Sequence, residues 1–242
     1  MVPAGRLLRR NDLDLYERHA ADWWDERSHA FRSLHGVNRF RSRLLEEWFG
    51  ERIRGARVVD LGCGGGLLAQ KMLERGASVV GVDLSHASLR AARAHLDGSS
   101  LFVQGDATCA PLHPGCADLV LMADLLEHVC DPALPLREAA RLLCSGGLAY
   151  VNTINRSRRA RLLAVTLAEG LGLVPRGTHD PALFITPAEL ERQAVAAGLR
   201  LVRIQGEAPA LLRTIRHWTI ELRKSASPGV TYSALLEKIH RA

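Results

Sequence analysis

The chain has 242 residues, 47% of them hydrophobic, which is enough for one well-cored α/β domain and too few for two full domains. Its formal net charge of +6 favours an anionic partner, whether nucleic acid, an acidic membrane surface or an anionic ligand. No stretch offers the roughly 20 apolar residues of a membrane span, and residues 1–12 lack the apolar core of a signal peptide. Five scattered cysteines form no CxxC pair and indicate neither a disulfide framework nor a structural zinc site. We therefore expect a single cytoplasmic domain spanning residues 1–242.

The predicted elements fall into four successive parts. Residues 12–49 have helical periodicity and many aromatic side chains, which predicts an N-terminal helical cap over residues 1–52. Residues 55–154 alternate short β-branched runs with helical patterns, which is typical of a doubly wound, mostly parallel α/β sheet. Residues 155–185 read as a helical insertion after the fifth strand. Residues 186–242 begin with a capping box, Thr186 to Glu189, ahead of a helix, and they complete the sheet.

A glycine-rich loop joins the first strand to its helix in the segment "VVDLGCGGGLLA", residues 58–69. Leu67 stands where the dinucleotide fingerprint GxGxxG needs a glycine, and no lysine followed by serine or threonine makes a P-loop. Phosphate recognition therefore fits poorly. The second strand ends at Asp83, about twenty residues beyond the loop, where a carboxylate can accept hydrogen bonds from ribose hydroxyls, and the third ends near Asp106. The loop glycines are Gly62, Gly64, Gly65 and Gly66.

This arrangement resembles the class I methyltransferases that use S-adenosyl-L-methionine. The resemblance implies a Rossmann-like sheet of seven strands, with residues 55–154 as the cofactor-binding half. It implies that the 62–66 loop passes the methionine part of the cofactor, that Asp83 holds the ribose and that Asp106 with Ala107 contacts the adenine. The other cofactor contacts that it implies are Arg41, Asp60, Cys63, Leu84 and Met122.

Four further strings narrow the resemblance to the ubiquinone-biosynthesis O-methyltransferases. They are "YERHAADWWDERSHAFRSLHGVNRFR" (16–41), "LLEHVCDP" (125–132), "TINRS" (153–157) and "VPRGTHDPALFITPAEL" (174–190). The resemblance implies methylation of a catechol-type hydroxyl on a polyprenylated ubiquinone precursor, a polyprenyl phenol or quinol. The tail from residue 205 departs from the family pattern, so a methyltransferase of specialised metabolism acting on another phenol is the alternative. An RNA methyltransferase and a non-catalytic cofactor-binding regulator are weaker alternatives, and we expect no nucleic-acid partner.

The segment "DLLEHVCDP", residues 124–132, places three ionisable groups after an apolar strand. If a helical turn starts at Asp124, then Glu127 and His128 share its face and the three could hold a divalent cation such as magnesium, zinc or manganese. A phenol with a pKa of roughly 10 needs either such a metal or a general base to ionise at neutral pH. Metal-free catalysis by His128 or His179 and a purely structural cluster stay open as alternatives.

The insertion joins four arginines to the apolar run "LLAVTLAEGLGLV". A basic amphipathic helix can lie in an anionic membrane surface. Such contact would suit a water-insoluble substrate, would place the protein at the inner face of the membrane and would allow it to join a biosynthetic complex there. The alternative interpretation is a helix that covers the sheet with its arginines in solvent. These arginines are Arg156, Arg158, Arg159 and Arg161.

Overall fold

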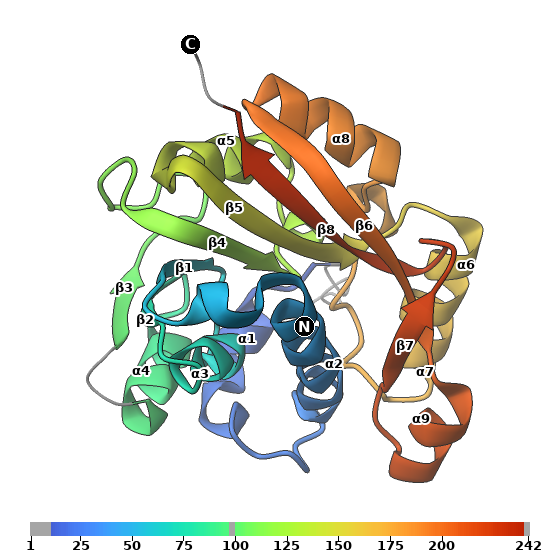
Figure 1. Ribbon diagram of the computed structural model, residues 1–242. Helices are drawn as coiled ribbons and strands as arrows, with labels where there is room; N and C mark the ends of the chain where they lie inside the picture. The colour runs from blue at the N-terminus through green and yellow to red at the C-terminus, as the bar shows by residue number, and fades with distance from the viewer. Residues whose placement is uncertain (1–10, 97–99, 240–242) are drawn as a thin grey trace, which may run out of the picture.

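A computed structural model describes residues 11–96 and 100–239. Within these ranges one twisted sheet of eight strands runs in the order β3-β2-β1-β4-β5-β8-β6-β7 (Figure 1). The first five strands in this order are parallel, and β8, β6 and β7 pair antiparallel. The strands are β1 Arg57–Leu61, β2 Ser78–Asp83, β3 Ser100–Gln104, β4 Ala117–Ala123, β5 Leu143–Ile154, β6 Leu199–Pro209, β7 Leu222–Ser225 and β8 Thr231–Lys238.

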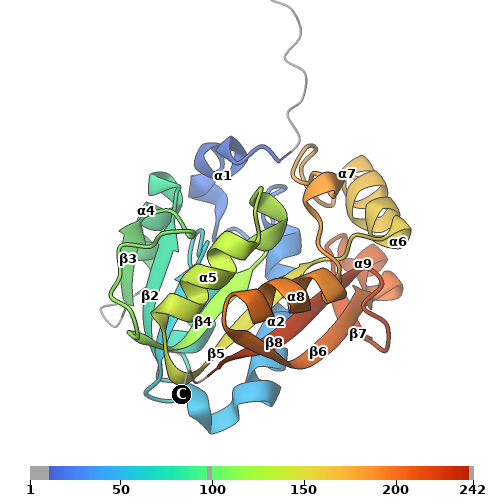
Figure 2. The same ribbon diagram turned by 90° about the horizontal axis from the view of Figure 1, so that it is seen from above.

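Helices cover both faces of the sheet, as the doubly wound prediction requires. In Figure 2, α5 and α8 lie in front of the sheet and α2 lies behind it. Two apolar cores result, because the central strands carry buried Val and Leu on both faces. The helices are α1 Asp14–Arg18, α2 Arg32–Phe49, α3 Leu67–Leu73, α4 His86–His95, α5 Ala133–Leu142, α6 Arg158–Ala160, α7 Ala168–Gly170, α8 Pro187–Ala196 and α9 Leu211–His217.

Helix α8 begins as the sequence predicts. The Thr186 hydroxyl accepts from the Glu189 amide and the Glu189 carboxylate accepts from the Thr186 amide, which forms a complete capping box with Pro187 at the first helical position. The insertion is also helical, but its middle, Arg161–Leu167, is a π-helix between α6 and α7. Within the described residues, no helix is both long enough and apolar enough to cross a membrane.

The number of strands corrects the prediction of seven. The additional strand, β7, has four residues and pairs only with the end of β6, from Gly206↔Ser225 to Pro209↔Leu222. Its sequence, Leu-Arg-Lys-Ser, is too short and too polar to show a strand period by itself.

The topology places the site at one edge of the sheet. Strand β1 is central, β2 and β3 follow on one side of it and β4 and β5 on the other, so the strand order reverses between β1 and β4. Ligands of open α/β sheets bind at the carboxyl ends of strands at such a reversal. Asp60, Asp83, Asp106 and Asp124 all lie at or just beyond the carboxyl ends of the first four strands.

Candidate functional site

The glycine loop between β1 and α3 is shaped for close approach to its backbone. Gly62, Gly64 and Gly66 have φ values of 75°, 52° and 82°, a region that L-residues seldom adopt. The indole of Trp23, from the N-terminal cap, lies against this loop. A Cβ built on Gly65 would come within 2.3 Å of Trp23 Cγ, and one on Gly64 within 2.4 Å of the same indole. The glycines therefore leave room beside the loop for the cavity and for the Trp23 indole that forms one wall of it.

Trp23 is held in this position from two directions. Its ring stacks on Phe31 with 4.0 Å between centroids, and its Nε1 donates to Ser88 Oγ at 2.9 Å. The side chain is buried and forms a small core with its neighbours while lining the cavity beside the glycine loop. Trp23 is thus both a packing residue and a wall of the cavity. Trp24 instead stacks on His95 and does not line this cavity within the described residues.

Asp83 ends β2 with both carboxylate oxygens already oriented by the backbone. Its Oδ2 accepts from the Gly64 amide at 2.8 Å, and its Oδ1 accepts from the Ser85 amide at 2.8 Å. A carboxylate oxygen has two lone pairs, so each oxygen retains capacity for a ligand hydroxyl. Asp106 follows β3, and its Oδ1 accepts from the amide and the hydroxyl of Thr108.

Asp60 is the buried acid of the site. Its side chain is 2% exposed, it lines the cavity, and its Oδ2 has no hydrogen-bond partner in residues 11–96 and 100–239. Burial, with the nearby charge of Asp83, raises the pKa of Asp60 to about 7. An unpaired buried acceptor costs free energy unless a ligand donor satisfies it. The cavity offers carboxylate acceptors at three strand ends and an open glycine loop. These groups therefore fit a cofactor that carries an ammonium and a ribose.

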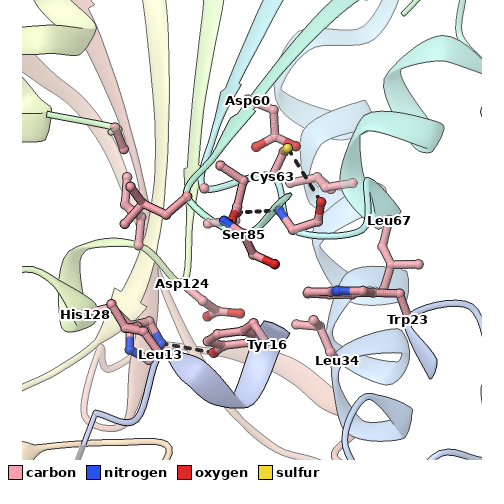
Figure 3. A pocket seen from close by; sticks show the side chains of 18 of the residues that line it. Leu13, Tyr16, Trp23, Leu34, Asp60, Cys63, Leu67, Ser85, Asp124 and His128 are labelled. Carbon is pink, nitrogen blue, oxygen red and sulfur yellow. Dashed lines mark hydrogen bonds between the residues drawn. The ribbon is translucent and has the colours of Figure 1, made fainter. Parts of the chain in front are cut away.

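The structure brings most of the predicted cofactor residues to one cavity (Figure 3). Met122 is different, because its side chain is fully buried in the core between the sheet and α5. Gly65 and Gly66 shape the loop without lining the cavity in the described chain. The predicted residues that do line it are Arg41, Asp60, Gly62, Cys63, Gly64, Asp83, Leu84, Asp106, Ala107, Asp124 and His128.

Arg41 and Asp124 form a largely buried ion pair at the floor of the site. Arg41 of α2 is 3% exposed, and its Nη2 donates to Asp124 Oδ1. Burial opposes ionisation of Asp124, but the Arg41 guanidinium outweighs burial and lowers the pKa of this carboxyl. Asp124 has φ 51°, an uncommon left-handed conformation for a non-glycine residue, and its amide donates to Asn152 O at 3.0 Å.

Glu127 does not line this cavity. Its side chain is fully buried, its Oε2 accepts from Thr153 Oγ1 at 2.7 Å, and its Oε1 has no partner among the described residues. Burial, together with the charge of Asp124, raises the pKa of Glu127 to about 8. Glu127 is therefore mostly protonated at neutral pH.

His128 lines the cavity, and its two ring nitrogens have different hydrogen-bond roles. Its Nδ1 lies 2.5 Å from Asn11 Oδ1, which only accepts, so Nδ1 carries the proton. Its Nε2 then accepts from the Tyr16 hydroxyl at 3.3 Å. Burial and the neighbouring His179 lower the pKa of His128 to about 4, so its imidazole is neutral at pH 7. Figure 3 shows His128, Tyr16 and Asp124 grouped around the same part of the cavity.

The predicted metal set Asp124, Glu127 and His128 does not form. Among the residues that the structure describes, no group of three His, Cys, Asp or Glu side chains is arranged to hold a metal ion. The prediction assumed one helical face, but Asp124 precedes a 3₁₀ turn, Leu126–His128, in a left-handed conformation. The three side chains consequently turn to three different partners.

A second, mostly apolar cavity adjoins the first. The two share Tyr16, Leu34, Arg41, Asp124 and His128. The second cavity also contains His179, whose ring is stacked 6.0 Å from that of His128. The side chains that enclose it include Ala164, Ala168, Val174 and Pro175 from the insertion and Ile220 and Leu222 from the C-terminal part.

His179 belongs to this second cavity and not to the first. Its Nδ1 lies 3.4 Å from Glu169 Oε1, and its amide donates to the same oxygen at 3.1 Å. Glu169 thereby fixes the position of His179 within the insertion. His128 is thus the one of the two predicted bases that reaches both cavities.

Sequence reasoning missed the polar partners of His128 and Arg41. Asn11 and Tyr16 lie more than one hundred residues before His128, and Asn152 lies 111 residues after Arg41. A signal existed only for Asn152, a polar residue inside an otherwise apolar strand pattern, "GLAYVNTI". No local pattern could have paired it with an arginine of the N-terminal cap.

Comparison with known proteins supports the class that the fold and cavity define. A family model described as "Methyltransferase domain" matches residues 59–151. An S-adenosylmethionine-dependent methyltransferase from Thermotoga maritima, a possible histamine N-methyltransferase, superposes with a TM-score of 0.65 at 22% identity and covers 93% of this chain and 98% of its own. One from Mesorhizobium loti has a TM-score of 0.60 at 23% identity and covers 81% and 96%. The chain has the fold of the class I S-adenosylmethionine-dependent methyltransferases.

Curated relatives narrow this class to one family. "Ubiquinone biosynthesis O-methyltransferase" of Thiobacillus denitrificans is 44% identical over 191 residues, covering 76% of this chain and 80% of the relative. The protein of the same name from Pseudomonas aeruginosa is 42% identical over 200 residues, covering 81% and 85%. The chain belongs to the ubiquinone biosynthesis O-methyltransferase family.

Proposed function

We propose that this protein transfers a methyl group from S-adenosylmethionine to a catechol-type hydroxyl of a polyprenylated ubiquinone precursor. The observation that carries the proposal is the meeting of a cofactor cavity and an apolar cavity at His128, whose Nε2 already accepts a hydrogen bond from a phenol, the Tyr16 side chain. The names of the relatives support the choice of acceptor.

S-adenosylmethionine, when bound, would supply a methyl group attached to a sulfonium sulfur. An oxygen nucleophile would attack the methyl carbon in line and displace the sulfur as a neutral thioether. Asp83, Asp106 and the glycine loop bind and orient it at the carboxyl edge of the sheet. Asp60 provides the unpaired acceptor for its ammonium group.

His128 acts as the general base. Its neutral imidazole presents an unprotonated Nε2 toward the point where the two cavities meet, so it can take the proton of the acceptor hydroxyl. Asn11 holds the ring orientation through Nδ1. The nearby Asp124 carboxylate favours the imidazolium that forms, because its negative charge raises the pKa of His128 against the effect of burial. Tyr16 occupies the position of the acceptor phenol and must yield it when substrate enters.

The acceptor is best identified with a transfer assay that uses labelled S-adenosylmethionine. We expect methylation of short-chain polyprenyl catechols and of the corresponding demethylated quinols, with weaker turnover of plain catechol because it fills less of the apolar cavity. Turnover of unrelated phenols alone would favour a methyltransferase of specialised metabolism. Cofactor binding without turnover of any phenol would contradict the proposed function.

A second candidate route, assisted by a divalent cation, requires Asp124 to leave Arg41 and Glu127 to leave Thr153. The unpartnered Glu127 Oε1, buried beside the Asp124 carboxylate, is the observation that favours this route. Thermal unfolding with added Mg²⁺ separates the two routes. A higher midpoint in the wild type but not in Glu127→Gln, with loss of turnover on chelation, would establish the cation route in place of the direct one.

We further propose that the insertion contacts an anionic membrane surface. Its π-helix exposes Leu162 and Leu167, and Leu171 is exposed directly after α7, while α6 carries basic residues. Helix α9, which lies at the same end of the molecule in Figures 1 and 2, exposes Leu211, Leu212 and Ile215. Apolar side chains flanked by arginines are the composition of an interfacial helix.

Sedimentation with liposomes tests the membrane proposal. Binding to anionic vesicles should weaken with salt and should fall in a Leu162→Ser/Leu167→Ser variant, whereas the matched Val195→Ser variant, exposed on α8, should bind like the wild type. Equal binding to neutral vesicles, or no binding to either, would contradict it.

A further inference from the structure

A buried acid outside both cavities leads back to the site. Glu207 on β6 is fully buried, and the groups that donate to its carboxylate within the described part of the chain are all neutral. Ser233 Oγ donates to its Oε1 at 2.5 Å, Thr231 Oγ1 donates to its Oε2 at 3.2 Å, and Asn152 Nδ2 lies 3.0 Å from each oxygen. A buried carboxylate is costly and needs a reason to be there.

Strand register explains how these groups meet. Asn152 of β5 pairs with Ser233 of β8, and Glu207 of β6 pairs with Thr231, two residues before Ser233 on that strand. Three neighbouring strands therefore present an amide, a hydroxyl and a carboxylate to one another. The cluster reaches from the antiparallel part of the sheet into its parallel part.

Asn152 continues this cluster to the site. Its Oδ1 accepts from Arg41 Nη2 at 2.5 Å and from Arg41 Nε at 3.1 Å. The same Nη2 donates to Asp124, which lines both cavities. An unbroken chain of contacts thus joins Glu207 to Asp124 through Asn152 and Arg41.

The chemistry of this chain gives Glu207 a defined task. A guanidinium only donates hydrogen bonds, so Arg41 requires the oxygen end of the Asn152 amide. A carboxylate accepts them, so Glu207 binds the nitrogen end. Without Glu207 the nitrogen end would keep the neutral acceptors Ser233 Oγ at 3.0 Å and Tyr232 O at 3.4 Å, and the amide could turn and present its N–H groups to the donors of Arg41.

We propose that Glu207 is a positioning residue for methyl transfer: it fixes the Asn152 amide, which in turn holds Arg41 and Asp124 where the cofactor and acceptor cavities meet. This role goes beyond the proposed acceptor, because cofactor binding reports on it without any acceptor. Failure of the catechol assay would therefore leave this test intact.

A polarity swap tests the proposal. In Glu207→Gln the residue behind Asn152 has the same shape but can donate as well as accept, and in Asn152→Asp two carboxylates face each other. The double variant Glu207→Gln/Asn152→Asp restores the order, since the carboxylate introduced on β5 accepts from Arg41 and the amide introduced on β6 donates to that carboxylate. The matched control is Glu237→Gln on β8, whose carboxylate pairs with Arg200 away from both cavities.

Cofactor affinity by calorimetry, turnover and the thermal midpoint are measured for each protein. We expect about tenfold weaker S-adenosylmethionine binding in each single variant, with a fall in kcat, and recovery to within about threefold of wild type in the double variant. The control should match the wild type. Unchanged affinity in Glu207→Gln would overturn the proposal. So would a double variant that stays weak or unfolded, because a merely structural carboxylate would not be rescued by exchanging its polarity with Asn152.

Discussion

At the scale of single residues, the surroundings of Asp124, Glu127 and His128 give these three neighbouring groups different protonation states. Asp124 beside Arg41 is ionised, whereas Glu127, three residues later, holds its proton to a pKa of about 8. His128 is kept neutral, with a pKa of about 4. Separated protonation states of this kind are typical of sites that move protons.

Glu127 should make stability fall as pH rises. Its pKa is raised from 4.5 to about 8 on folding, so between these values the folded state binds the proton that the unfolded state has lost. Stability from this group is present at the acidic end of the window and is lost toward pH 8. The thermal midpoint of Glu127→Gln should therefore rise relative to that of the wild type by about 3–5 °C for each pH unit between these two pKa values. A constant difference from pH 5 to pH 8 would show that Glu127 is not perturbed.

Asp83 should matter for the cofactor more than for the fold. Asp83→Asn replaces one of the two acceptor oxygens by a donor, which would face either the Gly64 amide or the Ser85 amide. We expect S-adenosylmethionine binding weakened by about 10- to 100-fold, measured by calorimetry. The exposed Asp25→Asn substitution in the cap serves as control. Equal affinity in Asp83→Asn and wild type would remove Asp83 from the cofactor site.

At the scale of elements, the N-terminal cap and the glycine loop form one unit. Gly65 has ordinary φ, so alanine is excluded there by the Trp23 ring and not by backbone strain. Gly65→Ala should lower the thermal midpoint strongly in the wild type but less in a Trp23→Gly background, because glycine lacks the Cβ and Cγ atoms that the new methyl group would meet. Equal losses in both backgrounds would contradict this packing.

The elements that carry the cofactor cavity were predictable from sequence, and those that complete the site were not. Each strand from β1 to β4 has a local apolar pattern and ends in an acid, so Asp60, Asp83 and Asp106 could be placed at one edge. The Asp124 and Asn152 partners of Arg41 and the Asn11 partner of His128 come from segments more than eighty residues away, and no periodicity encodes such pairs. The helical face that Asp124, Glu127 and His128 were expected to share does not form, because Asp124 is left-handed and precedes a 3₁₀ turn.

At the scale of the whole molecule, three segments from different parts of the chain enclose one reaction space. The sheet edge supplies the cofactor cavity, while the cap, the insertion and the strands after residue 205 close the apolar cavity. The tail that departs from the family pattern thus contributes Ile220, Leu222 and Thr231 to the acceptor side. Differences in acceptor between this protein and its relatives should arise there.

Binding of the cofactor should stabilise the whole domain, since its cavity joins the cap to four strands. At a concentration one hundred times its Kd, a ligand specific for the folded state adds about 2.7 kcal/mol. That corresponds to an increase of about 5–11 °C in the midpoint for a chain of this size. Differential scanning calorimetry with S-adenosylhomocysteine measures it, and NAD at the same concentration is the control. An equal shift with NAD would contradict the assignment of the cavity.

The central claim is that His128 takes the proton of a phenolic acceptor, and the most direct measurement is the single-turnover rate of methyl transfer in wild type and His128→Asn, with S-adenosylmethionine affinity measured in parallel. The exposed His113→Asn substitution is the control. We predict a rate about 10²- to 10⁴-fold lower in His128→Asn, with cofactor affinity within about threefold of wild type. Wild-type rates of catechol methylation in His128→Asn would contradict the claim.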